Sequence, residues 1–218
     1  MDSGRNLLYD SAGIAPERSF MPSSERKASS LIAPADLSLI DADEARDLLA
    51  AALVPDPKSG ILRLSGQPAV IIRPDVIVNI QRQLEQTIGG SAKGVLYLAG
   101  ERSSKEGVAP VRAISREPAG SLAIDAAKRM TDAFSLLGWG RAEVTHFDAG
   151  HGRFALRFAN SPIALAYGSS KKPVCHFLAG WAAGMVRDLV GRELLCEEIA
   201  CAAQGKDYCE FDLRPIPS

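Results

Sequence analysis

Long apolar runs, excess charge of one sign and histidine are all scarce in this 218-residue sequence. No apolar run approaches the roughly 20 residues of a membrane-spanning helix, and the N-terminus lacks the apolar core of a secretory signal. The formal net charge is -1, so bulk charge gives no reason to expect nucleic acid or an anionic membrane as a partner. We therefore expect a cytoplasmic protein with no membrane span and no direct nucleic-acid partner.

Motifs of common catalytic sites are also missing from the sequence. It contains no G-x-S-x-G, no phosphate-binding loop and no G-x-G-x-x-G after an expected strand. Residues 89–94 (G-G-S-A-K-G) include glycine and lysine but lack the spacing and the trailing hydroxyl residue of a phosphate-binding loop. We assign no catalytic residue, and these absences favour a binding protein over an enzyme.

Cysteine is absent from the first 174 residues, and all four cysteines lie in the last fifth of the chain. Without an export signal, such a cluster indicates metal ligands or reduced thiols rather than a disulfide framework. Cys175, Glu198, Cys201 and Cys209 are separated by 22, two and seven residues. Three thiolates with one oxygen suit zinc, and four protein ligands leave no open position for chemistry. The set therefore predicts a structural metal site.

The alternative is that these cysteines are small buried residues without a metal, since free cysteine is among the most buried residue types. A buried Glu198 would be costly without a partner, which favours the metal. A helix expected at 173–190 would place Cys175 at its N-terminus, where the helix dipole favours a thiolate. Two strands expected at 193–200 and 208–213 would flank a tight turn, so that the last two cysteines can converge.

The remaining segments alternate between helical and hairpin patterns. Residues 1–35 carry scattered glycine, proline and serine without periodicity and predict a flexible N-terminal arm. Residues 36–218 are expected to form one ligand-binding domain. The fold class that we predict is α+β: a mixed, mainly antiparallel sheet with packed helices and a zinc-clasped C-terminal β-hairpin. Helices are expected after about residue 41, at 74–88 and at 122–137, and hairpins at 60–72 and 141–158.

Residues 173–209 carry the pattern P-V-C…G-W-A-A-G…G-R-E-L-L-C-E-E-I-A-C-A-A-Q-G-K-D-Y-C. It resembles the C-terminal signature of the 4-vinyl reductase domain family, named for proteins of bacteriochlorophyll synthesis. It is also similar to the sensor domains of phenol- and toluene-responsive transcriptional activators. The zinc ligands of those sensors match Cys175, Glu198, Cys201 and Cys209 without a gap. The likeness extends over about 56–215, where 95–98 resembles the strand that precedes the sensors' ligand pocket.

The resemblance implies an apolar ligand cavity between the sheet and the helices. His146 is a candidate for a polar pocket contact or for an axial ligand of a metal tetrapyrrole. Alternatively, these side chains are ordinary residues of the core and the sheet. The other candidates for the cavity lining are Trp139, Phe154, Phe158, Trp181, Met185 and Cys196.

The ligand implied by the resemblance is not phenol itself. The histidine and tryptophan that hold the phenol hydroxyl in the sensors correspond here to Leu136 or Leu137 and to Phe158. None of these can donate a hydrogen bond, and an unpartnered buried polar group costs roughly 1–3 kcal/mol. We expect a larger or more apolar ligand, such as a tetrapyrrole or a hydrophobic metabolite.

The family resemblance implies a stand-alone small-molecule-binding protein, a sensor or carrier of a hydrophobic or aromatic ligand, with structural Zn²⁺. Its output would pass through a homodimer or a protein effector. The alternative is a 4-vinyl reductase-type protein that acts on or carries a bacteriochlorophyll precursor. A third hypothesis is an assembly module, because the family's fold resembles subunits of vesicle-tethering complexes.

Overall fold

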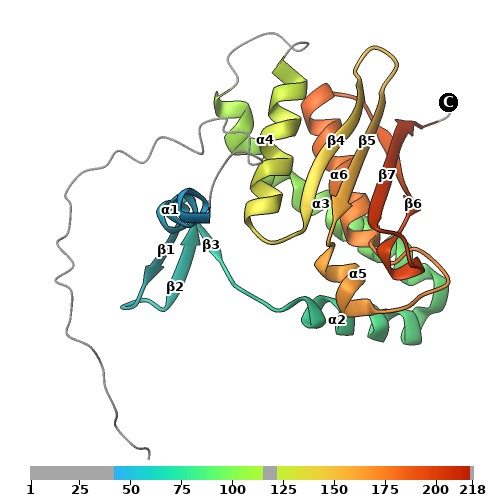
Figure 1. The fold of residues 1–218 in the computed structure, drawn as a ribbon, viewed down its shortest axis with the longest axis horizontal. Coiled ribbons are helices and arrows are strands. Elements are labelled where there is room, and N and C mark those ends of the chain that lie inside the picture. Colours follow the sequence, from blue (N-terminus) through green and yellow to red (C-terminus); the bar gives the residue numbers. More distant parts are fainter. Residues whose placement is uncertain (1–41, 115–121, 217–218) are drawn as a thin grey trace, which may run out of the picture. The chain divides into compact units, whose positions relative to one another are not determined.

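The computed structural model describes residues 42–114 and 122–216, which belong to one compact unit spanning 31–218 (Figure 1). The arm expected at 1–35 lies outside the described residues. The elements are α1 (Ala42–Ala52), β1 (Leu53–Asp56), β2 (Ile61–Leu64), β3 (Gln67–Ala69), α2 (Pro74–Ile88), η1 (Gly89–Ser91), α3 (Ala92–Ile114), α4 (Leu122–Leu136), β4 (Arg141–Asp148), β5 (Arg153–Ala159), α5 (Pro162–Tyr167), α6 (His176–Val190), β6 (Leu194–Ala200), η2 (Ala202–Gln204) and β7 (Tyr208–Pro215).

A small antiparallel sheet, β1-β2-β3, follows α1. The predicted hairpin turn is confirmed at Ser65 and Gly66, whose φ angles of 49° and 85° are those of a two-residue primed turn. Strand β1 was not predicted, because Pro55 argues against a strand. It is tolerated because β1 is the edge of its sheet, where a missing N–H costs little.

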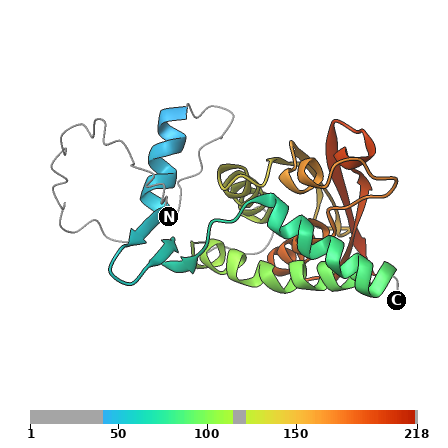
Figure 2. The same ribbon diagram turned by 90° about the horizontal axis from the view of Figure 1, so that it is seen from below.

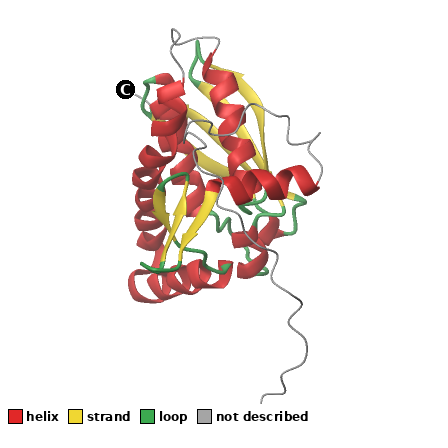
Figure 3. Ribbon diagram, turned by 90° about the vertical axis from the view of Figure 1, so that its left-hand side faces the viewer, coloured by secondary structure: helices red, strands yellow, loops and turns green. Residues whose placement is uncertain are grey.

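The larger sheet is antiparallel throughout, in the order β4-β5-β7-β6. Its inner face is built by strict alternation in the two central strands, as period-2 patterning requires. Phe158 lies opposite Cys209, and Leu156 lies opposite Phe211, and all four are essentially inaccessible. Figure 3 shows this sheet in yellow with the helices in red packed against it. The sheet therefore places the last cysteine within the hydrophobic core.

Helix α6 is buried over most of its circumference, as expected for an apolar helix between two layers. It packs on the sheet through β6 and on α3 along much of its length. Gly180 faces the backbone carbonyl of Tyr97 so closely that an added Cβ would overlap that oxygen. Gly100 on α3 faces the Phe177 carbonyl in the same way. These glycines set how closely the two helices approach each other.

The strand expected at 95–98 is wrong, because this segment belongs to α3, which continues from α2 through η1 (Figure 2). Its buried positions recur every four residues, at Ala92, Leu96, Gly100 and Ser104. Glycine and serine in this row suggested a loop, but small residues are what a close contact with α6 requires. Packing between the two helices thus overrides local propensity.

The α+β class is confirmed, with mainly antiparallel sheets and packed helices. Helix α4 and the β4–β5 hairpin follow the sequence prediction closely. Helix α6 begins three residues later than expected, directly after Cys175. Within the described ranges, no helix combines the length and apolar character needed to cross a membrane.

Candidate functional site

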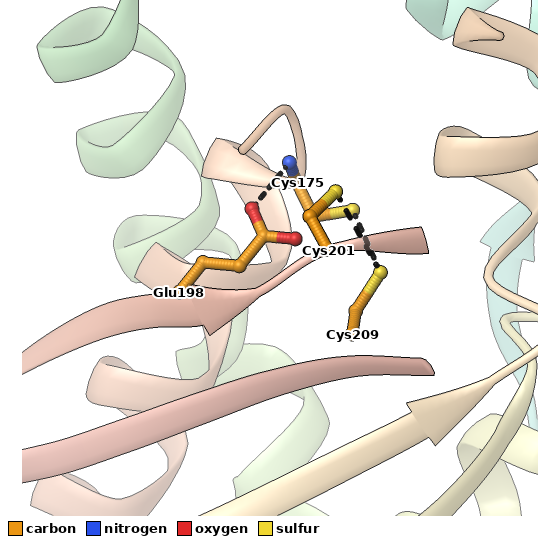
Figure 4. A group of neighbouring side chains, drawn as sticks. All are labelled: Cys175, Glu198, Cys201 and Cys209. Atoms are coloured by element: carbon orange, nitrogen blue, oxygen red, sulfur yellow. Dashed lines mark hydrogen bonds between the residues drawn. The ribbon is translucent and has the colours of Figure 1, made fainter. Parts of the chain in front are cut away.

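Four side chains converge at the C-terminal end of the fold, where α6 begins beside strands β6 and β7 (Figure 4). The three sulfur atoms and a carboxylate oxygen of Cys175, Glu198, Cys201 and Cys209 all lie within 4.8 Å of one another. The cysteines are completely buried and Glu198 is 8% exposed. The structure thus brings together all four residues that the sequence proposed as one ligand set.

Local structure explains this convergence. Cys175 is the N-cap of α6, and Glu198 lies on β6 with its side chain on the buried face. Cys201 directly follows that strand, and the short helix η2 with the turn at Gly205 reverses the chain. Cys209 is the second residue of β7, and its sulfur faces that of Cys201 at 3.9 Å. A tight hairpin and a helix start are sufficient to close the cluster.

The donor set fits a tetrahedral zinc ion. Zn–S bonds of about 2.3 Å place two tetrahedral sulfur ligands about 3.8 Å apart. The sulfurs of Cys175 and Cys209 are 3.6 Å apart, and those of Cys201 and Cys209 are 3.9 Å apart. Glu198 Oε1 is buried and has no hydrogen-bond partner among the described residues, while Oε2 accepts the Cys175 N–H at 2.8 Å. A cation would satisfy the orphaned oxygen, as buried acceptors require.

The pKa directions within the cluster indicate too much negative charge for it to hold without a cation. Burial and the neighbouring Cys201 raise the pKa of Glu198 to about 8. Hydrogen bonds from Cys175 and Cys209 lower the pKa of Cys201. Hydrogen bonding to Cys201 and Cys209, together with burial, raises the pKa of Cys175 well above its ordinary value. One ionised thiol therefore suppresses the others, and a bound divalent cation would reverse that balance.

Outer groups orient and support the ligands. The Ala202 N–H donates to the Cys209 sulfur at 3.4 Å, and the Ser161 hydroxyl lies 3.6 Å from the Cys175 sulfur. Ser161 is completely buried and also caps α5, where it accepts the Ala164 N–H. Donors aimed at thiolates stabilise their charge, and such outer partners tune metal affinity.

A second support comes from α2. Gln81 is 1% exposed, and its amide donates both to the Val174 carbonyl at 3.1 Å and to Glu85 at 2.9 Å. Tyr167 donates its hydroxyl to the other oxygen of Glu85 at 2.8 Å. Since Val174 directly precedes Cys175, this chain of hydrogen bonds fixes the segment that carries the first ligand. Sequence reasoning missed it, because a single glutamine on an amphipathic helix carries no local signal.

Most residues predicted to line a ligand cavity lie in the hydrophobic core between the sheet, α4 and α6. Trp139 and Trp181 both contact Phe134, with ring centroids 5.5 and 3.6 Å away, and Phe158 contacts its edge at 6.4 Å. We call these four residues the aromatic cluster. Phe134 was not predicted, although its place on the apolar face of α4 could have indicated it.

The remaining predicted pocket residues are dispersed. Phe154 and Met185 are completely buried, and Phe154 packs against Phe147. His146 is exposed on β4, next to the bulge that interrupts the β4–β5 register. Cys196 is buried, and its backbone N–H donates to the Tyr97 hydroxyl at 3.0 Å. Burial raises the pKa of the Cys196 thiol well above its ordinary value, so this thiol stays protonated.

Two clefts open at opposite ends of α6. One, of about 580 Å³, reaches the metal cluster through Val174 and Glu198. We call it the lysine cleft after Lys93, Lys171 and Lys172, which line it together with Tyr97 and other residues. Cys196 also lines it and is the single predicted pocket residue to do so.

The other cleft, of about 640 Å³, lies at the C-terminal end of α6. Its arginine, Arg187, is paired with Glu101 and with Asp188. Its charges are thus largely neutralised within the fold.

Residues 154–215 match the model of the vinyl-4-reductase domain family. The predicted resemblance to the 4-vinyl reductase domain family is confirmed over this segment, which contains all four cluster residues. An uncharacterised protein of Methanocaldococcus jannaschii, MJ1460, is 31% identical over 48 residues, which are 22% of this chain. The match spans 30% of that relative's length.

Solved structures share the fold over a longer range. The phenol-responsive sensory domain of the transcription activator PoxR, solved with phenol, aligns with a TM-score of 0.66. The alignment covers 81% of this chain and 92% of that domain at 19% identity, a level that establishes a shared fold. A vinyl-4-reductase family protein from Methanocaldococcus jannaschii aligns with a TM-score of 0.46 over 68% of this chain and 85% of its own, at 20% identity.

Proposed function

We propose that this chain is a small-molecule-binding protein, a sensor or carrier of a hydrophobic or aromatic ligand, whose C-terminal segment is held by a structural zinc ion. The observation that carries the proposal is the buried cluster of three cysteines and a glutamate within the segment that matches the family. Four protein ligands would leave zinc no open position, so the metal would stabilise the fold and take no part in chemistry. The fold shared with a phenol-responsive sensory domain supports a sensing role.

The ligand would enter between the sheet and the helices at the aromatic cluster. Trp139 is partly buried, while Phe158 and Trp181 lie in the core. Rings in contact can separate to admit a flat apolar molecule, and each buried aromatic side chain offers a large apolar surface. Since the phenylalanine at 158 has no hydrogen-bonding group, an apolar ligand fits this cluster better than phenol does.

The output would pass through a homodimer or through a protein effector, and the protein would act in the cytoplasm. The four free cysteines suit a reducing compartment, where thiols remain available as ligands. No described residue is assigned a catalytic role in this proposal.

Native mass spectrometry of the purified protein, before and after denaturation, tests the proposal. It measures zinc stoichiometry, ligand mass and oligomeric state together. We expect one zinc ion per chain and a bound molecule that is released on denaturation. A visible absorbance band would identify that molecule as a tetrapyrrole, and a metal-free native protein would refute the structural role of zinc.

Tryptophan fluorescence tests the ligand site directly, because Trp139 and Trp181 are the two tryptophans of the chain. Naphthalene, a neutral aromatic probe, should quench this fluorescence saturably. Phe158→Ala should change the affinity, whereas Phe147→Ala, on the far side of Phe154, should not. Equal quenching of both variants and the native protein by a non-saturable process would count against the site.

A further inference from the structure

The lysine cleft carries more positive charge than its surroundings neutralise. Lys93 enters it from α3, and Lys171 and Lys172 enter from the loop before α6. None of the three ammonium groups forms a hydrogen bond or an ion pair with another described residue. Lysines close to one another repel, so their convergence on one cleft favours a bound anion.

The acidic side chains of the cleft are already engaged. Both carboxylate oxygens of Glu85 accept hydrogen bonds, one from Gln81 and one from Tyr167. Glu197 is paired with Arg214 at 2.7 Å. Glu198 points into the metal cluster. The lysines thus retain their charge for a ligand from outside the fold.

Tyr97 adds a neutral donor to the same cleft. Its oxygen accepts the Cys196 N–H at 3.0 Å, and its own proton is not bonded to any described residue. Burial raises the pKa of Tyr97, so the hydroxyl keeps its proton at neutral pH. A group that binds here must therefore accept hydrogen bonds.

The inner wall of the cleft is less polar than its rim. Val174 and Ala179 are buried there, and Pro173 and the Tyr167 ring complete the surface. A volume of about 580 Å³ falls in the range of small-molecule sites. The combination of a cationic rim and a partly apolar wall suits an organic anion with an apolar body.

We propose that the lysine cleft is a second ligand site, separate from the aromatic cluster, which binds a small organic carboxylate. The carboxylate head contacts Lys93, Lys171 and Lys172 at the rim, and the apolar body lies against Val174 and Ala179. Because the cleft reaches Glu198, the bound anion lies next to the metal cluster, so this ligand and the zinc site contact the same segment of chain.

Two probes with one apolar body separate the charge from the hydrophobic contribution: 4-phenylbutyrate and its alcohol, 4-phenyl-1-butanol. Each is titrated into the zinc-loaded full chain and followed by NMR of the three histidine side chains. His176 lines the cleft, whereas His151 lies in the distant β4–β5 turn. We expect 4-phenylbutyrate to shift the His176 signals and not those of His151, with an affinity about tenfold above that of the alcohol.

The variant K93Q/K171Q/K172Q should lose about tenfold in affinity for 4-phenylbutyrate. The control K58Q/K105Q/K128Q removes three exposed lysines outside the cleft and should bind as the native chain does. Raising the salt concentration should weaken binding of the acid and leave the alcohol unaffected. Equal affinities for acid and alcohol, an unchanged triple variant or no shift at His176 would each overturn the proposal. Naphthalene quenching in the same triple variant tests the aromatic cluster separately.

Discussion

The sulfur atoms of Cys175 and Cys209 lie 3.6 Å apart, although 34 positions separate these residues in the sequence. This is close to the edge of a tetrahedral zinc–thiolate site, about 3.8 Å, and far from the roughly 2.05 Å of a disulfide bond. The N-terminus of α6 and the start of β7 are thereby held together at the end of the sheet. The cluster thus closes the C-terminal segment on itself.

Removing one proposed ligand should release the metal. In Cys209→Ser, zinc content measured by elemental analysis should fall from about one ion per chain to near zero. The free energy of unfolding should fall by at least about 3 kcal/mol, since a buried charged cluster loses a partner. Cys196→Ala is the matched control, because Cys196 is also buried but lies outside the cluster. Full zinc content in Cys209→Ser would contradict the proposed ligand set.

The metal-free and metal-loaded proteins should depend on pH with opposite signs. In the metal-free fold the pKa of Glu198 is raised to about 8, so the native state binds more protons than the unfolded chain between about pH 4.5 and 8. Stability of the metal-free protein should therefore fall as the pH rises through that window. With zinc bound, acid should destabilise instead, because protons compete with the metal for its ligands.

Thermal unfolding of chelator-treated and zinc-loaded samples over this pH range measures both slopes. Glu198→Gln should remove the metal-free slope. Glu197→Gln, an exposed position on the same strand, should retain it. If both variants kept the slope, Glu198 would not be its source.

Gln81 should act on the metal through the segment before Cys175. Gln81→Leu leaves the Val174 carbonyl without its partner, and zinc should be transferred to a chromophoric chelator about tenfold faster. Gln83→Leu is the control, since Gln83 lies on the same helix and bonds the exposed Thr87. An equal effect of both substitutions would indicate a general change in α2 rather than positioning of the ligand.

The close approach of α3 and α6 should make Gly180 intolerant of any side chain. Gly180→Ala places a Cβ against the Tyr97 carbonyl oxygen, so the helices must separate. We expect a loss of about 1–3 kcal/mol in the free energy of unfolding. Gly94→Ala on α3 has open space around its Cβ and should gain about 0.5–1 kcal/mol through helix propensity. Denaturant unfolding of the two variants should thus give opposite signs.

Residues whose role depends on local spacing could be predicted from the sequence. The tight turn before Cys209 and the helix that begins after Cys175 follow from turn and helix signals, and together they bring the cluster into view. Helix α5 was missed, although Ser161 followed by Pro162 is a helix-start signal that could have found it. The cap is also the residue whose hydroxyl approaches the Cys175 sulfur.

Features that depend on tertiary packing could not be predicted. The Gly100 and Ser104 positions of α3 look like a loop until α6 is placed against them. Likewise, Gln81 and Tyr97 become important through partners that are 93 and 99 positions away. The lysine cleft combines α3 with the loop before α6, and no local pattern links these segments.

X-ray absorption spectroscopy at the zinc edge, on protein purified without added metal, tests the central claim most directly. The account predicts one zinc ion per chain with three sulfur ligands at about 2.3 Å and one oxygen ligand at about 2.0–2.2 Å. Cys201→Ser should lose this signature, while Cys196→Ala should keep it. A folded native protein without zinc, or zinc bound by a different ligand set, would contradict the account.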